Sequence, residues 1–168
     1  VKVAHNLFYD VDAKRWGGAG IFLLIGEGPE EIVFEHNTID QSGNIMSVFG
    51  GSKQSPQTIP GFVFRDNLVR HNQYGVHGAD RAYGTDSLNA FFPGGIFSHN
   101  GIAGGNARLY PAGNVFLDEA QYDREFIDPR GGDFRLRPGS RFRRAASDGK
   151  DLGADIAAIA YAAGLRRR

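Results

Sequence analysis

The sequence contains no cysteine among its 168 residues, which excludes disulfides, thiolate metal sites and cysteine nucleophiles. It has one methionine and one tryptophan, and its formal net charge is zero. No stretch approaches the roughly 20 consecutive apolar residues of a membrane-spanning helix, so we expect no membrane partner. Before residue 150 no window of about ten residues carries apolar side chains at the helical period, which excludes a helical-repeat protein.

What the sequence does contain is a motif that occurs four times, centred on an asparagine that recurs after 31, 30 and 33 residues. Each copy has an apolar residue three positions before the asparagine and another two positions after it, an alternation that favours short strands. A fixed period in this range is typical of repeat architectures. The four copies are Val3–Phe8, Phe34–Ile39, Phe64–Val69 and Phe97–Ile102, and their asparagines are Asn6, Asn37, Asn67 and Asn100.

A second short apolar run follows the motif in each of the first three copies, as in residues 20–24. Glycine occurs 24 times, about twice its average frequency, and suits a chain that turns every few residues. Short strands, frequent turns and one asparagine per repeat predict an all-β fold, a parallel β-helix. Neighbouring strands would lie about 4.8 Å apart. We therefore expect the four asparagines to form a hydrogen-bonded structural ladder, like the asparagine stacks of amyloid.

These repeats resemble those of right-handed parallel β-helix proteins of the pectate-lyase-like superfamily, in which an Asn-Asn-x-Ile stretch precedes a Gly-Ile-x-Leu stretch. The matching residues are 5–8 followed by 20–23, and 66–69 followed by 75–76. Residues 114–116, 126–129, 132–140 and 151–155 are similar to the closing segment of bacterial members, although residues 141–144 depart from it. The resemblance implies a right-handed parallel β-helix solenoid of about four coils with a short C-terminal helix. It also implies a secreted, periplasmic or cell-surface location.

We expect a single domain, in which residues 1–129 form the coils and residues 130–168 form a closing segment. An Ala-rich stretch from Asp155 to Gly164 has the start and stop signals of a helix that caps the end. The chain begins inside a strand motif, with no polar cap and no signal peptide, and open strand edges invite pairing. These features predict the C-terminal part of a longer protein or a processed product, or self-association through the uncapped N-terminal coil.

The zero net charge conceals an asymmetry between the two parts of the chain. Residues 1–129 carry 9 Lys and Arg against 15 Asp and Glu, and residues 130–168 carry 10 against 4. A basic segment of this kind binds nucleic acid or an acidic polysaccharide, or it neutralises the acidic coils of its own chain. Because no aromatic-interleaved motif accompanies the charges, we expect no nucleic-acid partner. The basic segment ends in Arg166, Arg167 and Arg168.

Two long loops, residues 9–18 and 79–93, combine cations, carboxylates and aromatic rings, the side chains that recognise sugars. Loops on a repeat scaffold gather on one face and often carry the binding function. The only tryptophan either stacks on a pyranose ring or folds back into the core. The candidate substrate-binding residues are Lys14, Arg15, Trp16 and Tyr83, and the candidate catalytic residues are Asp80, Arg81 and Asp86.

A lyase acting on uronic acids must neutralise the sugar carboxylate, remove the C5 proton and stabilise the resulting enolate. The resemblance implies that Arg81 or Arg15 would act as base or charge clamp. Asp80 and Asp86 would hold Ca²⁺ if that cofactor is used, since oxygen ligands suit this ion. No tight acidic cluster marks a Ca²⁺ site, so no cofactor is predicted outright. A glycoside hydrolase needs two carboxylates roughly 5 to 9.5 Å apart, and the polygalacturonase pattern is absent. If the chain is an enzyme, a lyase is favoured over a hydrolase.

A column of titratable residues precedes the ladder, formed by His5, His36 and His99, with Asp66 at the same position in the third copy. At strand spacing, His5, His36 and Asp66 of the first three copies would stack. Imidazole with carboxylate is a ligand set for Zn²⁺ or Cu²⁺. This spacing is that of any neighbouring strands. We therefore predict no metal site.

Two functions remain open from the sequence. The first is the C-terminal part of a secreted carbohydrate-active protein that recognises an acidic polysaccharide, with cleavage by this chain left undecided. The second is a non-catalytic structural or adhesin-like module. The fold that the resemblance implies hosts both enzymes and non-enzymes, so it does not choose between them.

Overall fold

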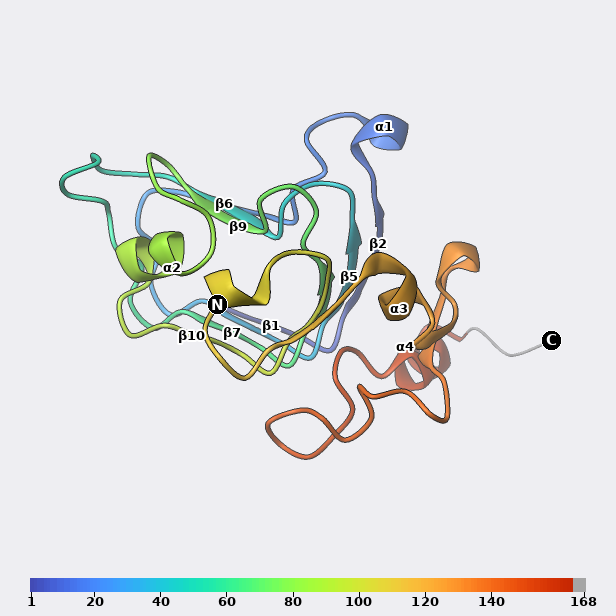
Figure 1. Ribbon diagram of the computed structural model, residues 1–168. Helices are drawn as coiled ribbons and strands as arrows, with labels where there is room; N and C mark the ends of the chain where they lie inside the picture. The colour runs from blue at the N-terminus through green and yellow to red at the C-terminus, as the bar shows by residue number, and fades with distance from the viewer. Residues whose placement is uncertain (165–168) are drawn as a thin grey trace.

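The structure, a computed structural model, describes residues 1–164, and its most regular feature is three parallel sheets (Figure 1). Each sheet collects one short strand from successive repeats. The first sheet contains β1 (Lys2–Ala4), β4 (Val33–Glu35), β7 (Val63–Arg65) and β10 (Ile96–Ser98). The second contains β2 (Leu7–Val11), β5 (Thr38–Gln41), β8 (Leu68–Arg70), β11 (Gly101–Ala103) and β12 (Val115–Leu117). The third contains β3 (Leu23–Ile25), β6 (Met46–Val48) and β9 (Val76–Gly78).

The described residues form a mixed α/β fold, with parallel sheets of four, five and three strands and four α-helices. The expectation of an all-β right-handed parallel β-helix solenoid of about four coils is therefore wrong. The sequence prediction took two segments as irregular loops that contain the helices α1 (Ala13–Trp16) and α2 (Thr85–Phe91), and it placed α3 (Glu119–Asp123) among the coils. The strands also belong to three separate sheets with free edge strands, and these sheets do not join into one closed sheet.

The motif copies nevertheless pair in register, and this pairing builds the main core. Phe34 of β4 pairs with Phe64 of β7, which pairs with Phe97 of β10. The ring centroids of Phe64 and Phe97 lie 5.3 Å apart, and all three side chains are buried. Stacked aromatic pairs add to the stabilisation that burial of their area provides.

The four motif asparagines form a continuous hydrogen-bonded ladder at the bend between the first and second sheets. The side-chain Oδ1 of Asn37 accepts bonds from the backbone N–H and the Nδ2 of Asn6, at 3.0 and 3.2 Å. Asn67 accepts from Asn37 in the same way, and Asn100 accepts from Asn67. The ladder has a fifth rung, Asn114, which the sequence prediction missed because it follows Asn100 after 14 residues.

The residue before each motif asparagine adopts the left-handed backbone conformation. These residues are His5, His36, Asp66 and His99, with φ between 51° and 59°. This conformation is unfavourable for most side chains and is enriched in His, Asp and Asn. It turns the chain sharply from one sheet into the next, so the four side chains lie in one column beside the ladder.

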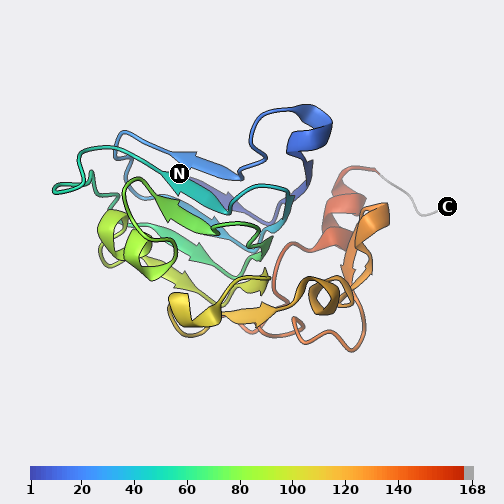
Figure 2. The same cartoon turned by 45° about the horizontal axis from the view of Figure 1, so that its top comes forward.

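The segment after β12 packs against the outer face of the second sheet (Figure 2). It contains α3, the antiparallel pair β13 (Phe126–Asp128) and β14 (Asp133–Leu136), and α4 (Ile156–Ala162). Tyr122, Phe126 and Phe142 are almost fully buried there against Leu68 and Leu117. Short 3₁₀ turns occur at Ala107–Leu109 and Pro129–Gly131. We call residues 118–164 the closing segment from here on.

The helix predicted over residues 155–164 is present as α4, and the carboxylate of Asp155 accepts the backbone N–H of Ala158 at its N-terminus. Within residues 1–164 no helix has the length and apolar character needed to cross a membrane. The predicted basic tail, Arg166, Arg167 and Arg168, lies outside the described residues.

Replacement of a central ladder asparagine is expected to destabilise the fold strongly. Asn67→Ala removes the acceptor for the backbone N–H of Asn37 and the donor to the carbonyl of Phe34, both in a fully buried site. Unpaired buried polar groups cost about 1–3 kcal/mol each, so we expect a loss of about 3 kcal/mol in the free energy of unfolding, measured by urea denaturation.

The matched control is Asn6→Ala at the exposed end of the same ladder. Its side chain donates to Asn37 and to the carbonyl of Ala4, and water can replace both contacts. We expect a loss of about 1 kcal/mol or less. Equal losses for the two variants would contradict the role assigned to the ladder.

Candidate functional site

The first predicted loop places its aromatic ring at the surface. Trp16 is 68% exposed at the end of α1, so it does not fill the core. Its indole Nε1 and the guanidinium Nη1 of Arg15 both donate to the Oδ2 of Asp10, each at 2.9 Å. The guanidinium lies 5.1 Å from the centroid of the Trp16 ring. Lys14 is in the same short helix, whose N-terminus is capped by Asp12.

The charged side chains of the second predicted loop bond to backbone groups, one in a neighbouring loop and one in the same loop. The guanidinium Nη2 of Arg81 donates to the backbone carbonyl of Lys53 at 2.7 Å. The carboxylate of Asp86 accepts the backbone N–H of Ala82 at 2.9 Å. Asp80 occupies a left-handed backbone position, with φ of 58°. The candidate catalytic residues Arg81 and Asp86 are thus both engaged in hydrogen bonds to backbone groups.

The structure does not bring the two predicted loops together. Both views draw α1 and α2 at opposite ends of the molecule, and the loop of Arg81 leads into α2 (Figures 1 and 2). Within residues 1–164 no group of three or more His, Asp or Glu side chains is placed to hold a metal ion. Tyr83 lies near other aromatic rings instead, with its centroid 6.1 Å from that of Tyr74.

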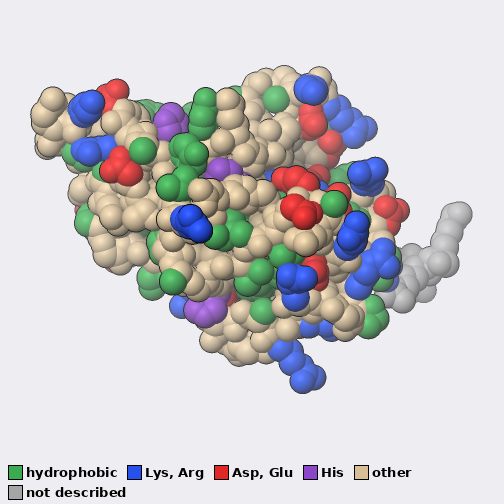
Figure 3. Space-filling model, viewed as in Figure 1, with side chains coloured by type: hydrophobic (Ala, Val, Ile, Leu, Met, Phe, Trp, Pro, Cys, Tyr) green, Lys and Arg blue, Asp and Glu red, His purple; other side chains and the backbone are tan. Residues whose placement is uncertain are grey.

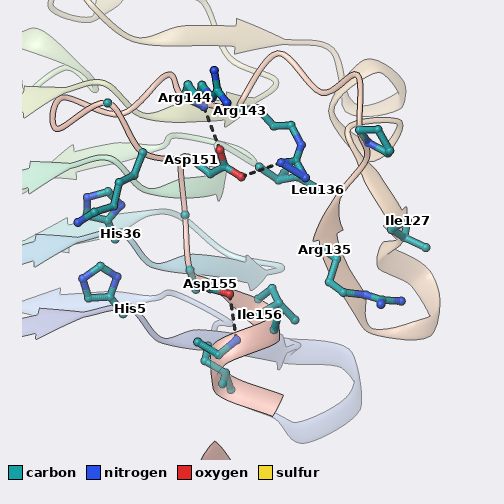
Figure 4. Close-up of a pocket in the computed structure, with 18 of the residues that line it drawn as sticks. His5, His36, Ile127, Arg135, Leu136, Arg143, Arg144, Asp151, Asp155 and Ile156 are labelled. Atoms are coloured by element: carbon teal, nitrogen blue, oxygen red, sulfur yellow. Dashed lines mark hydrogen bonds and ion pairs between the residues drawn. The ribbon is translucent and has the colours of Figure 1, made fainter. Parts of the chain in front are cut away.

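We call the column of residues that precede the motif asparagines, His5, His36, Asp66 and His99, the bend column. A cleft of about 1030 Å³ lies between the bend column and the closing segment, and we treat it as the candidate site. Figure 4 shows His5 and His36 one above the other on one wall, with Arg135 and Ile127 on the opposite side. The apolar part of the lining comes from the closing segment: Ile127, Leu136, Pro138, Ala154, Ile156, Ala157, Ala158, Ile159 and Ala162.

The two histidines form the polar wall of the cleft. Their rings stack with centroids 4.9 Å apart and planes 16° from parallel. The Nε2 of His36 lies 3.4 Å from a carboxylate oxygen of Asp148 and 3.8 Å from one of Asp66. Asp66 is buried and accepts bonds from the backbone N–H and the hydroxyl of Ser147, at 2.7 and 2.6 Å.

Burial and neighbouring charges shift the pKa values of two side chains at this wall, His5 and Asp148. Desolvation, followed by the neighbouring His36, lowers the pKa of His5 below its ordinary value. The imidazole of His5 is therefore mostly neutral at pH 7 and can accept a proton. The hydrogen bond from Lys150 lowers the pKa of Asp148 to about 2, so that carboxylate is ionised at neutral pH.

The cleft also has a cationic side, of which one member is unpaired. Arg143 lies 3.4 Å from Asp151, and Lys150 lies 2.8 Å from Asp148. Arg135 forms an ion pair with Asp133. The guanidinium of Arg144 is exposed and has no ion-pair partner in the described part of the chain. The lining of the cleft therefore includes one cation without an ion-pair partner and two imidazoles.

Half of the cations in the closing segment form ion pairs within the chain. Figure 3 shows acidic and basic side chains interspersed over the side where α3 lies. Arg70 forms ion pairs with Asp40, Glu119 and Asp123, and Arg141 pairs with Glu125. Internal ion pairs thus account for four of the seven described cations in residues 130–164, and Arg144 is the unpaired one in the cleft.

The sequence prediction missed the cleft because its two walls come from distant parts of the chain. It recognised the column of His5, His36 and Asp66, but it considered that column only for metal binding. It treated residues 130–168 as a cap. The sequence contained a titratable column followed by basic residues 130–168, and nothing in the spacing showed that Asp148 would lie beside His36 or that Arg144 would line the same cleft.

Comparison with known proteins adds no relative: no protein-family model, curated protein or solved structure matches this chain. Nothing therefore identifies it as a member of the pectate-lyase-like superfamily. That resemblance stays a prediction from the motifs.

The lowered pKa of His5 can be measured directly. We expect its imidazole proton resonances in an NMR titration to change with a midpoint below 6.5. Because the unfolded chain then binds the proton more readily than the folded one, this group reduces stability as the pH falls below that value.

The variant His36→Ala removes both the stacked ring and a like charge, so the His5 midpoint should rise toward 6.5. His99→Ala alters the same column in the fourth repeat and should leave the midpoint unchanged. A His5 midpoint at or above 6.5 in the unmodified protein would contradict the proposed desolvation of this wall.

Proposed function

We propose that the chain binds an acidic polysaccharide in the cleft between the bend column and the closing segment. The observation that supports it best is the unpaired cation Arg144 in the lining of a cleft that His5 and His36 also line. A guanidinium is matched to a carboxylate in charge and in geometry, because it presents two parallel N–H donors. The carboxylate of a uronic acid is the anionic group that we assign to this position.

The rest of the lining fits the amphipathic surface of a sugar ring. The apolar side chains of Leu136 and Ile156 can cover the C–H face of a pyranose. The imidazole nitrogens of His5 can donate to or accept from hydroxyl groups. Binding sites of this kind combine a mainly apolar lining with a few fixed polar groups.

Catalysis is a separate question from binding. The neutral imidazole of His5 has the chemistry of a general base, the group that a lyase uses to remove a proton beside a carboxylate. Against catalysis at the predicted residues, Arg81 and Asp86 are engaged in bonds to backbone groups of Lys53 and Ala82. Because Arg81 and Asp86 are already engaged in these bonds, the alternative of a non-catalytic binding or adhesin-like module is favoured over a lyase centred on Arg81.

The binding proposal predicts a loss of affinity when the free cation is removed. We expect Arg144→Gln to weaken binding of polygalacturonate roughly tenfold, about 1.4 kcal/mol, measured by isothermal titration calorimetry. The affinity of the unmodified protein should also fall as salt rises to about 0.15 M, because exposed charges are screened.

The matched control is Lys53→Gln, which removes an exposed cation from the loop of residues 52–55, away from the cleft. It should bind polygalacturonate as the unmodified protein does. Equal losses of affinity in both variants would mean that the loss in Arg144→Gln comes from the change in net charge and not from the cleft. A parallel assay for the ultraviolet absorbance of unsaturated uronides separates a lyase from a binding module.

A further inference from the structure

Three aromatic side chains form an exposed surface at the third sheet, and the proposed function does not use it. The ring of His77, on β9, lies 5.3 Å from the ring of Tyr74, and Tyr74 lies 6.1 Å from Tyr83. Tyr74 and Tyr83 are 39% and 37% exposed. We call Tyr74, His77 and Tyr83 the aromatic platform. All three lie within residues 74–83, on β9 and in the turns before and after it.

The aromatic platform rests on a buried polar network. Beneath Tyr83 lies His71, which is 2% exposed and contacts the Tyr83 ring edge to face at 6.2 Å. The Nε2 of His71 lies 2.8 Å from the hydroxyl of Tyr110, which also accepts the backbone N–H of Val76 at 3.1 Å. Burial raises the pKa of Tyr110 to about 12, so the phenol keeps its proton at neutral pH.

The backbone next to the platform is also specified closely. Gly75 has φ of +59°, and a Cβ there would lie 2.2 Å from the hydroxyl of Tyr110 and 2.4 Å from the Nε2 of His71. The backbone N–H of Tyr74 donates to the side chain of Asn44 at 3.0 Å, and the amide of Gln73 donates to the hydroxyl of Tyr74. These contacts hold the rings before any ligand arrives, which reduces the entropy cost of binding.

The size and chemistry of the aromatic platform suit a small uncharged ligand better than a protein partner. A stable protein–protein interface buries about 800 Å² on each partner, far more than three partly exposed rings offer. The platform contains no Lys, Arg, Asp or Glu, so it has no group for a charged ligand. Its edges carry hydroxyl, amide and imidazole groups, from Tyr74, Tyr83, Gln73, His77 and Ser47, the neighbour of His77 on β6.

From this combination of flat rings and polar edges we infer that the aromatic platform binds a neutral oligosaccharide by stacking on the apolar faces of its pyranose rings. The C–H groups of one face of a pyranose pack on an aromatic ring, while its equatorial hydroxyls reach the polar edges. This site is separate from the cleft and does not depend on the proposed function. Stacking involves no net charge, so its salt dependence is small.

The test uses cellohexaose, xylohexaose and mannohexaose as probes, with binding followed by NMR shifts and by calorimetry. We expect at least one hexasaccharide to shift the resonances of Tyr74, His77 and Tyr83. Tyr83→Ala should reduce the affinity about fivefold, in line with the worth of one aromatic contact. The affinity should change less than about twofold between low salt and about 0.15 M salt.

Two controls separate stacking from unfolding and from general loss of a tyrosine. Tyr83→Phe keeps the ring, so it should keep the affinity, while a thermal melt reports on the fold of each variant. Tyr161→Ala removes a tyrosine that is 89% exposed on α4 and should leave binding unchanged. Arg144→Gln, which impairs the cleft, should also leave hexasaccharide binding unchanged.

The inference is overturned if no hexasaccharide shifts the platform resonances, or if Tyr161→Ala weakens binding as much as Tyr83→Ala. It is also overturned if a single-stranded oligothymidylate binds the platform while the sugars do not, because the rings would then stack on bases. Loss of polygalacturonate binding alone would count against the cleft and leave this inference standing.

Discussion

The asparagine ladder is the constraint on which the rest of the structure depends. Each ladder asparagine after Asn6 donates to a backbone carbonyl of the preceding repeat while its oxygen accepts the backbone N–H of the preceding asparagine, as at Asn37 and Asn67. A shift in register would leave these buried donors and acceptors unpaired at every rung. Because the register is fixed there, the phenylalanines of the first sheet stack inside the core, and His5 and His36 stack outside it. The candidate site is therefore a consequence of the same bend that builds the core.

The position of the closing segment follows from one exception in the bend column. The third repeat has Asp66 where the other three have histidine, and its carboxylate is buried and bonded to Ser147. A buried carboxylate is costly unless hydrogen bonds compensate it, so this residue attaches the closing segment at one place. The N–H of Gly153 also donates to the carbonyl of Asp66, and that of Ala154 to the hydroxyl of Thr38. These attachments hold the closing segment opposite the histidines and leave the cleft between them.

The sequence specified the repeats better than it specified the fold class. The spacing of Asn6, Asn37, Asn67 and Asn100 identified side chains that the structure joins, because one period encodes both strand pairing and ladder. The helices α1, α2 and α3 were missed since each has at most seven residues, too short to be stable or recognisable by periodicity alone. Their positions depend on local caps, such as the carboxylates of Asp12 and Asp118, and on packing. The contact of His36 with Asp148 joins segments more than a hundred residues apart, and no local pattern encodes it.

The two binding surfaces proposed here differ in the physics of recognition, and this difference follows from how the chain uses its charges. Three of the four cations that line the cleft form internal ion pairs, so the cleft offers one free guanidinium rather than a broad basic field. The aromatic platform has no charge and relies on rings held by a buried network. Each contact alone supports only weak binding. A polymer that contains both uronic acid and neutral sugar units, and that is long enough to reach both surfaces, would bind the second one as an intramolecular event, and the combined affinity would exceed either contact. A repeating polysaccharide, unlike a small metabolite, has the length to gain from this arrangement.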